Sequence, residues 1–225
     1  MKQIRAVIFD AYGTLLDIHT AMARHATRLG PNWRQISADW RTKQIEYCWV
    51  RSMVGPAQHR DFWRLTQEAL EVVAEIHGIT DTALKADILS AYRRLDAYPE
   101  VPAMLQALKA KGLACAILSN GEPGMLHDAV TAAGIAPLLD AVLSVESVRV
   151  FKPNPRVYRL AGRRFGLAPR EMAFVSANPW DAFGAHELGF RVFRLNRTEA
   201  PDEYGLRGTV PELADLRGLV DRLGG

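Results

Sequence analysis

The chain has 225 residues, of which 48% are hydrophobic and 24% are charged, and its net charge is +3. This composition suits one large domain, or a core domain that carries an insertion. It excludes a membrane-spanning helix, because the longest apolar stretches fall far short of the roughly 20 residues that such a helix needs.

The N-terminal segment and the cysteines indicate the cellular compartment. The apolar run that ends at Asp10 is too short and too polar for a secretion signal. Cys48 and Cys115 are the only cysteines, and they lie far apart in different kinds of segment. We therefore expect two buried free thiols rather than a disulfide framework or a zinc site, and a cytoplasmic protein.

Short apolar runs rich in Val, Ile, Leu and Phe recur along the chain and have the length of buried strands. They lie at residues 4–9, 113–118, 141–145, 172–175 and 191–195. Amphipathic stretches separate them, and Gly112 and Gly134 suit the ends of two such helices. The alternation predicts an α/β fold: a Rossmann-like parallel sheet with helices on both faces.

Residues 17–98 depart from this alternation. Apolar residues recur at spacings of three and four over residues 62–76, and nearly so over residues 84–95, which is typical of helices that pack on one another. An earlier helix is predicted from near Pro31 through Ile36, Trp40 and Tyr47, with the proline in its first turn. We expect a helical insertion here, and a core domain made of residues 1–16 and 99–225.

The helix predicted over residues 62–76 is defined by its apolar stripe. The stripe consists of Phe62, Leu65, Ala69, Val72 and Ile76. We expect these side chains to face a neighbouring helix of the insertion.

Polar side chains follow four of the predicted strands. They are Asp10 after the first strand, Ser119 and Asn120 after the second, Lys152 after the third, and Ser176, Asn178 and Asp181 after the fourth. Each alone has an ordinary explanation as a cap or turn residue. In an open parallel sheet, however, ligands bind outside the carboxyl ends of the strands. The joint occurrence of these polar residues at successive strand ends therefore predicts a single active site.

The motif DxxGTLxD at Asp10, together with Ser119-Asn120, Lys152-Pro153 and a late Asp181, resembles the haloacid dehalogenase superfamily. The resemblance extends over the whole chain, and residues 17–98 are similar to the helical cap domain of that superfamily. Most members are magnesium-dependent phosphatases in which a second aspartate, two residues after the nucleophile, serves as general acid and base.

Two departures from the phosphatase pattern stand out in this chain. Tyr12 occupies the place of the second aspartate, and SANPWD, with Ser176 and Ala177, replaces the pattern GDxxxD. The chain therefore offers few carboxylate oxygens for the kind of site that Mg²⁺ needs. With DAYGTLLD, WRTKQIEYCWVRSMVG, LSNG and FVSANPWDAFGA, these departures resemble the L-2-haloacid dehalogenase branch, whose nucleophile works without a metal.

The resemblance implies hydrolytic dehalogenation of short L-2-haloalkanoic acids to D-2-hydroxy acids, with no cofactor and no metal. The Asp10 carboxylate would attack carbon two and form an ester that water then cleaves. Lys152 would keep Asp10 ionised and oriented, since an adjacent cation favours a carboxylate. Asp181 would activate the water as general base, although an acid that stabilises a helix N-terminus would stand at the same place.

The resemblance also implies how the substrate and the halide are held. Hydrogen bonds to the nucleophile or the substrate carboxylate would come from Thr14, Ser119, Ser176, Asn178 and the backbone amides near Ala11 and Tyr12. The leaving halide would contact Arg41 from the cap, Asn120 and the ring of Trp180. Tyr12 would shape an apolar pocket, and Ile45 and Phe62 are either part of its wall or part of the helical core.

Two other functions stay open at this point. A magnesium-dependent phosphomonoesterase of the same superfamily would lose its activity when the metal is removed, and a noncatalytic protein on this scaffold would release no halide. The expected partners are a small 2-haloacid and the halide product. Scattered arginines and the absence of a recognised motif argue against nucleic acid, a membrane partner is not expected, and the resemblance predicts a homodimer.

Overall fold

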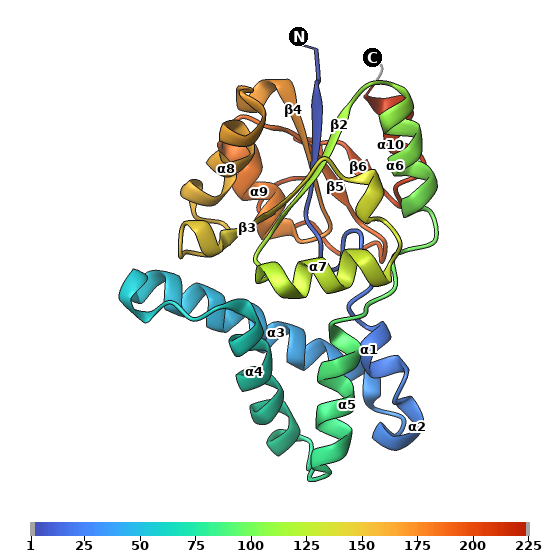
Figure 1. The fold of residues 1–225 in the computed structure, drawn as a ribbon, viewed down its shortest axis with the longest axis vertical. Helices are drawn as coiled ribbons and strands as arrows, with labels where there is room; N and C mark the ends of the chain where they lie inside the picture. Colours follow the sequence, from blue (N-terminus) through green and yellow to red (C-terminus); the bar gives the residue numbers. More distant parts are fainter. Residues whose placement is uncertain (1–2, 224–225) are drawn as a thin grey trace.

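A parallel sheet occupies the centre of the larger lobe of the molecule (Figure 1). The structure is a computed structural model and describes residues 3–223. The six strands have the order β3-β2-β1-β4-β5-β6. They are β1 (Ala6–Phe9), β2 (Ala114–Ser119), β3 (Ala141–Ser144), β4 (Met172–Ser176), β5 (Arg191–Leu195) and β6 (Glu212–Leu213). The α/β fold with a parallel sheet is confirmed; β6 was not predicted, because two residues are too few to form a recognisable pattern.

Helices cover both faces of this sheet. In Figure 1, α6 and α10 lie on one side of the strands and α8 and α9 lie on the other. The helices of this lobe are α6 (Val101–Ala110), α7 (Pro123–Ala132), α8 (Pro155–Phe165), α9 (Pro179–Glu187) and α10 (Leu219–Arg222), with short 3-10 turns η2 (Ala136–Leu138), η3 (Val145–Ser147) and η4 (Pro169–Glu171). Each connection between parallel strands crosses over in the right-handed sense. The direction in which the chain moves along the sheet therefore determines which face each helix covers.

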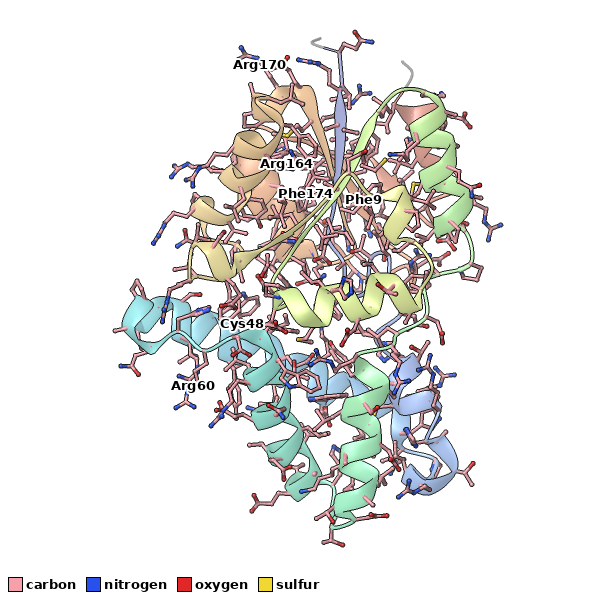
Figure 2. The ribbon with its side chains drawn as sticks, viewed as in Figure 1. Phe9, Cys48, Arg60, Arg164, Arg170 and Phe174 are labelled. Carbon is pink, nitrogen blue, oxygen red and sulfur yellow. The ribbon has the colours of Figure 1, made fainter. Side chains whose placement is uncertain are left out.

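The middle of the sheet is the hydrophobic core. Phe9 of β1 and Phe174 of β4, which Figure 2 labels, are fully buried, and Ile8 pairs with Phe174 in the register of the two strands. Strands that are covered on both faces need continuous apolar sequence, which is why these runs could be recognised. The chain passes from β1 to β2 and β3 on one side of β1, and then crosses back from β3 to β4 on the other side. In such a sheet, ligands bind at the carboxyl ends of the strands where the order reverses, here those of β1, β2 and β4.

The smaller lobe consists of helices inserted after β1. They are α1 (Thr20–Ala23), α2 (Ala26–Leu29), α3 (Trp33–Val54), α4 (Phe62–Ile76) and α5 (Thr82–Tyr92), with the 3-10 turn η1 (Pro56–Gln58) between α3 and α4. Helices α3 and α4 pack against each other, and the Trp40 indole Nε1 donates to the Thr66 carbonyl at 2.9 Å. In Figure 1 this lobe lies beyond α7, at the carboxyl end of the sheet.

Two details of the predicted cap helices were wrong. Helix α3 begins at Trp33, near Pro31, but the proline lies outside its first turn, because the Asn32 carbonyl accepts the first helical hydrogen bond. The helix continues past Tyr47 to Val54. In α4 the buried stripe passes through Val73, and Ile76 is 66% exposed. A helix turns every 3.6 residues, which brings Val73 onto the face of Phe62.

The two segments that join the lobes run side by side. The Asp17 amide donates to the Asp96 carbonyl at 2.9 Å, and the Tyr98 amide donates to the Leu15 carbonyl at 3.0 Å. On the other side of the interface, the Phe151 amide of the core donates to Ser52 Oγ of α3 at 3.0 Å. These paired linkers support our proposal that residues 17–98 form a cap domain on a core of residues 1–16 and 99–225.

Two smaller sequence expectations also concern the fold. Cys48 and Cys115 are both buried and free, as predicted. Within residues 3–223, no helix combines the length and the apolar character needed to cross a membrane. The cytoplasmic location stays a prediction.

Candidate active site

The Asp10 carboxylate lies at the carboxyl end of β1 and is held by donors from three parts of the chain. Thr14 Oγ1 donates to Asp10 Oδ2 at 3.0 Å, and Asn178 Nδ2 donates to the same oxygen at 2.8 Å. Lys152 Nζ donates to Asp10 Oδ1 at 3.1 Å. Asp10 is only 4% exposed. The carboxylate is therefore fixed in one orientation and largely shielded from water, which suits a nucleophile.

A tight loop after β1 explains how Thr14 reaches back to Asp10. The Ala11 carbonyl accepts hydrogen bonds from the Leu15 and Leu16 amides, both at 3.0 Å. Gly13 has a φ of 90°, in the left-handed region that glycine adopts most easily. The loop thus turns the chain so that the Thr14 hydroxyl also accepts from the Ala177 amide at 2.9 Å, which links β1 to β4.

Lys152 supplies the positive charge of the site. Its Nζ donates to Asp181 Oδ2 at 2.8 Å as well as to Asp10, and its side chain is fully buried. Burial by itself lowers the pKa of Lys152, but the charges of Asp10 and Asp181 more than compensate and raise it above its usual value. The ammonium group is therefore protonated. Asn120 Oδ1 accepts from the Lys152 amide at 2.9 Å and positions this residue.

Asp181 lies in the first turn of α9, where the helix dipole favours an acid. Ser176 Oγ donates to Asp181 Oδ2 at 3.0 Å, and Tyr158 Oη donates to Asp181 Oδ1 at 2.7 Å. Burial raises the pKa of Asp181 to about 6; the nearby Lys152 opposes this shift and the negative Asp10 adds to it. A carboxylate with a pKa near 6 can exchange a proton close to neutral pH.

Tyr158 of α8 was missed by the sequence interpretation. Burial and the charge of Asp181 raise the pKa of Tyr158 well above its usual value, so that its hydroxyl stays protonated and donates to that carboxylate. In the sequence, Tyr158 lies in an amphipathic helix between Val157 and Ala161, which are also buried. Nothing in that local pattern separates it from a core aromatic residue.

The cap contributes to the site from α3. Arg41 Nη2 donates to the Tyr12 carbonyl at 3.4 Å, a long contact across the two lobes. Trp49 of α3 packs edge-on against Trp180 of α9, with ring centroids 5.6 Å apart. Arg41 and Trp180, which we expected near the halide, are thus both at the interface between the cap and the core.

Tyr12 is buried among aromatic rings of the cap. Its ring stacks on Tyr92 at 5.6 Å and lies 5.8 Å from Phe62. Burial raises the pKa of Tyr12 well above its usual value, so the phenol is neutral. Phe62 is fully buried in the hydrophobic core beside Tyr12. Ile45 is nearly buried, and its place in the pocket wall or in the helical core stays a prediction.

Two of the predicted residues use a side-chain oxygen for contacts within the protein. Ser119 Oγ accepts from the Gly121 amide at 3.0 Å and so shapes the turn after β2. Asn120 uses its side-chain carbonyl to hold Lys152, which leaves only its amide nitrogen for a ligand. The predicted roles of Ser119 in substrate binding and of Asn120 in halide binding stay predictions.

The donor set does not fit a magnesium ion. Each oxygen of the Asp10 and Asp181 carboxylates already accepts a hydrogen bond, and the Lys152 ammonium group, bonded to both, already supplies a positive charge there. Tyr12 adds no carboxylate. Across residues 3–223, no cluster of three or more His, Cys, Asp or Glu side chains could hold a metal ion. Mg²⁺ requires several oxygen ligands in near-octahedral geometry, which this site does not offer.

Comparison with known proteins agrees with this fold and this set of residues. The profile of the haloacid dehalogenase-like hydrolase family matches residues 4–189. The (S)-2-haloacid dehalogenase 1 of Pseudomonas sp. (strain CBS-3) is 44% identical, with 99% of each chain covered. The (S)-2-haloacid dehalogenase 4A of Burkholderia cepacia is 43% identical over 99% of this chain and 93% of that protein.

A solved structure extends the comparison to three dimensions. The L-2-haloacid dehalogenase from Xanthobacter autotrophicus with covalently bound chloropropionic acid has a TM-score of 0.88 and 35% identity, and 99% of each chain is covered. The present chain belongs to the haloacid dehalogenase-like hydrolases, and within them to the L-2-haloacid dehalogenase branch.

Proposed function

We propose that this protein hydrolyses short L-2-haloalkanoic acids to D-2-hydroxy acids and halide through a covalent ester on Asp10, without a metal. Its place in the branch makes it a hydrolase that acts on carbon–halide bonds. The observation that carries the mechanism is the buried arrangement of Lys152 between Asp10 and Asp181, with hydrogen bonds of 3.1 and 2.8 Å from its Nζ.

In the first step, Asp10 Oδ1 attacks carbon two from the side opposite the halogen. The bond from Oδ1 to carbon forms as the carbon–halogen bond breaks, and the halide leaves with the bonding electron pair. Within the described residues Oδ1 accepts one hydrogen bond and Oδ2 accepts two, so Oδ1 is the oxygen with the freer lone pair. Backside attack inverts the carbon, which turns an L-halo acid into a D-hydroxy acid.

In the second step, water attacks the carboxyl carbon of the Asp10 ester. Asp181 accepts the proton of that water and passes it to the departing hydroxy acid. Negative charge develops on Oδ2, which faces Thr14 Oγ1 at 3.0 Å and Asn178 Nδ2 at 2.8 Å. Preorganised donors of this kind contribute about 3 to 4 kcal/mol each in other hydrolases. The oxygen of the water remains in Asp10, and the former Oδ1 leaves in the product.

Arg41 and Trp180 supply the environment for the leaving halide in this proposal. Arg41 faces the core from the cap, where its Nη2 lies 3.4 Å from the Tyr12 carbonyl. A guanidinium group and the edge of an indole ring both stabilise a large anion as its charge develops. The covalent chloropropionic acid in the Xanthobacter relative is consistent with a covalent intermediate of this kind.

The covalent step is tested by a single turnover in heavy-oxygen water with enzyme in excess over L-2-chloropropionate. We expect the label to enter Asp10, found by mass spectrometry of the peptide that contains it, before any label appears in lactate. Asp10→Asn should release no chloride. Label that appears first in the product would mean that water attacks carbon two directly.

The competing phosphatase function is tested with the same protein preparation. Halide release from chloro-, bromo- and fluoroacetate is measured with and without EDTA, beside hydrolysis of p-nitrophenyl phosphate with Mg²⁺. We expect EDTA to leave dehalogenation unchanged. Magnesium-dependent phosphate release without halide release would replace this proposal with the alternative.

A further inference from the structure

Arg197 of the core touches both the loop that carries Thr14 and the segment through which the chain returns from the cap. It lies two residues after β5, at the carboxyl end of the sheet. The turn that holds it is well anchored, because the Asn196 amide donates to the Leu213 carbonyl at 2.8 Å and Asn196 Oδ1 accepts from the Ala200 amide at 2.9 Å. Arg197 therefore projects from a rigid base.

The guanidinium group of Arg197 makes three contacts. Its Nη2 donates to the Thr14 carbonyl at 3.3 Å. Its Nη1 forms an ion pair with Glu100 Oε1 at 2.6 Å, and both side chains are largely buried. Its plane lies over the Tyr98 ring, 3.7 Å from the centroid. Among the side chains, only the planar guanidinium group of arginine can donate hydrogen bonds from its edge and stack on an aromatic ring through its face.

These contacts join two structures on which the proposed reaction depends. Thr14 orients Asp10 through its hydroxyl, so its carbonyl must be held if that hydroxyl is to stay in place. Tyr98 belongs to the paired linkers, where its amide donates to the Leu15 carbonyl at 3.0 Å. Movement of the linkers would change both the angle of the cap, which carries Arg41, and the loop that presents Thr14.

We propose that Arg197 is a positioning residue of the active site: it fixes the Thr14 loop and the cap linker in one geometry. This role rests on the function proposed above and adds a residue outside the catalytic contacts. Arg197 touches none of the reacting atoms, so it acts on the orientation of Asp10 rather than on substrate contacts. Its loss should lower kcat more than it raises KM.

The kinetic test compares Arg197→Met with Arg191→Met. Arg191 is a matched control at the opposite end of β5, where it also lies over an aromatic ring, Phe193, and donates to a carbonyl, that of Arg222, at 3.1 Å. We expect kcat of Arg197→Met to fall about tenfold or more with KM within about threefold, since small misplacements of reacting groups cost rate. Arg191→Met should match the wild type.

Chemical rescue separates positioning from general damage to the fold. The Arg197 side chain is 17% exposed, so a small cation can reach the space left in Arg197→Ala. We expect methylguanidinium at millimolar concentration to restore kcat in a saturable way. Methylammonium carries the same charge, but it cannot stack on the Tyr98 ring and donate in-plane hydrogen bonds at the same time. It should therefore restore little of the lost kcat. Equal rescue by both cations, or rescue by neither, would overturn the role assigned to the guanidinium fork.

Hydrogen exchange tests the inference independently of catalysis. Peptides that cover residues 14–18 and 95–101 should exchange about tenfold faster in Arg197→Met than in Arg191→Met, because local opening of the linkers becomes easier. Peptides from β4 (Met172–Ser176) should be unchanged. Unchanged exchange in the linkers would refute the inference even in an active enzyme. A wild type that releases no halide would instead refute the proposed function.

Discussion

At the scale of single residues, the site has one buried cation and two buried carboxylates. Lys152 bonds to both Asp10 and Asp181, so one negative charge remains uncompensated within the triad. Burial makes that excess charge unfavourable, and the pKa of Asp181 is raised to about 6 as a result. The two acids are thereby distinguished: Asp10 receives its donors from Thr14, Asn178 and Lys152, and Asp181 is placed to take up a proton.

The raised pKa of Asp181 predicts how activity depends on pH. A general base must be deprotonated to work, and below its pKa of about 6 Asp181 carries a proton. We therefore expect kcat to fall as the pH is lowered through 6, and to approach a tenfold loss for each further pH unit. The measurement is halide release at saturating substrate between pH 4.5 and 8.

Tyr158→Phe serves as the control for this assignment. The Tyr158 hydroxyl donates to Asp181, and this hydrogen bond lowers the pKa of the carboxyl group. Removal of the hydroxyl should move the acidic limb of the kcat profile to higher pH. A limb that stays in place would assign the titration to another group.

At the scale of elements, α9 carries Trp180 and Asp181 into the site, and its packing is tight where α8 crosses it. A Cβ at Gly184 would lie 2.7 Å from Tyr158 Oη and 2.8 Å from Pro153 Cβ. Sequence patterns could predict both helices from their periodicity and the prolines at their starts, Pro155 and Pro179. They could not predict which helical glycine is required, because the constraint comes from a neighbouring helix.

Gly184→Ala tests this close packing. Helix propensity alone would favour alanine by about 1 kcal/mol, but the added methyl group must displace Tyr158 or Pro153. We expect the free energy of unfolding in urea to fall by about 1 to 3 kcal/mol, and kcat to fall with it as Tyr158 moves from Asp181.

Gly124→Ala is the matched control in α7. The atoms closest to a Cβ at Gly124 are a guanidinium nitrogen of Arg93 and the carboxylate oxygens of Glu122, which accept from the Gly124 and Met125 amides as the N-cap of the helix. This variant should lose at most the contribution of that cap, about 1 kcal/mol, and should keep the kcat of the wild type. Similar losses in both variants would show that any alanine in these helices is harmful, and would contradict the specific contact with Tyr158.

At the scale of the whole molecule, the site forms only where the cap meets the core. The core supplies Asp10, Lys152 and Asp181, and the cap supplies Arg41 and the aromatic rings around Tyr12. Trp49 and Trp180 touch across the same interface. The resemblance found in the sequence also predicts a homodimer, and we assign its interface to a groove of about 630 Å³ between α3 and α4, which exposed valines and charged side chains line together.

The groove has the properties of a surface that a second copy of the chain would cover. Val50, Val54 and Val72 line it together with charged residues such as Arg51 and Glu68, and Met53 beside it is 77% exposed. A two-fold axis would bring the same surface of each copy together and bury these exposed apolar side chains. We expect the wild type to sediment as a dimer at micromolar concentration.

Val50→Glu combined with Val54→Glu should convert this dimer to a monomer in analytical ultracentrifugation, because the interface would then bury unpaired charges. Val142→Glu is the control, since Val142 is an exposed valine on β3 of the core, away from the groove. A dimer that survives the double substitution but is lost in Val142→Glu would place the interface on the core instead.

The sequence by itself determined β1 to β5, the helical insertion and the motif residues, because these depend on local periodicity and on residue types at strand ends. Asp10, Lys152 and Asp181 could be assembled from topology alone, since parallel strands bring their carboxyl ends to one edge. Tyr158 and Arg197 could not, because Tyr158 has the pattern of an ordinary buried residue of an amphipathic helix and Arg197 belongs to none of the motifs, so nothing marked their contacts with Asp181 and Thr14. Only tertiary packing decides such contacts, and no local pattern records them.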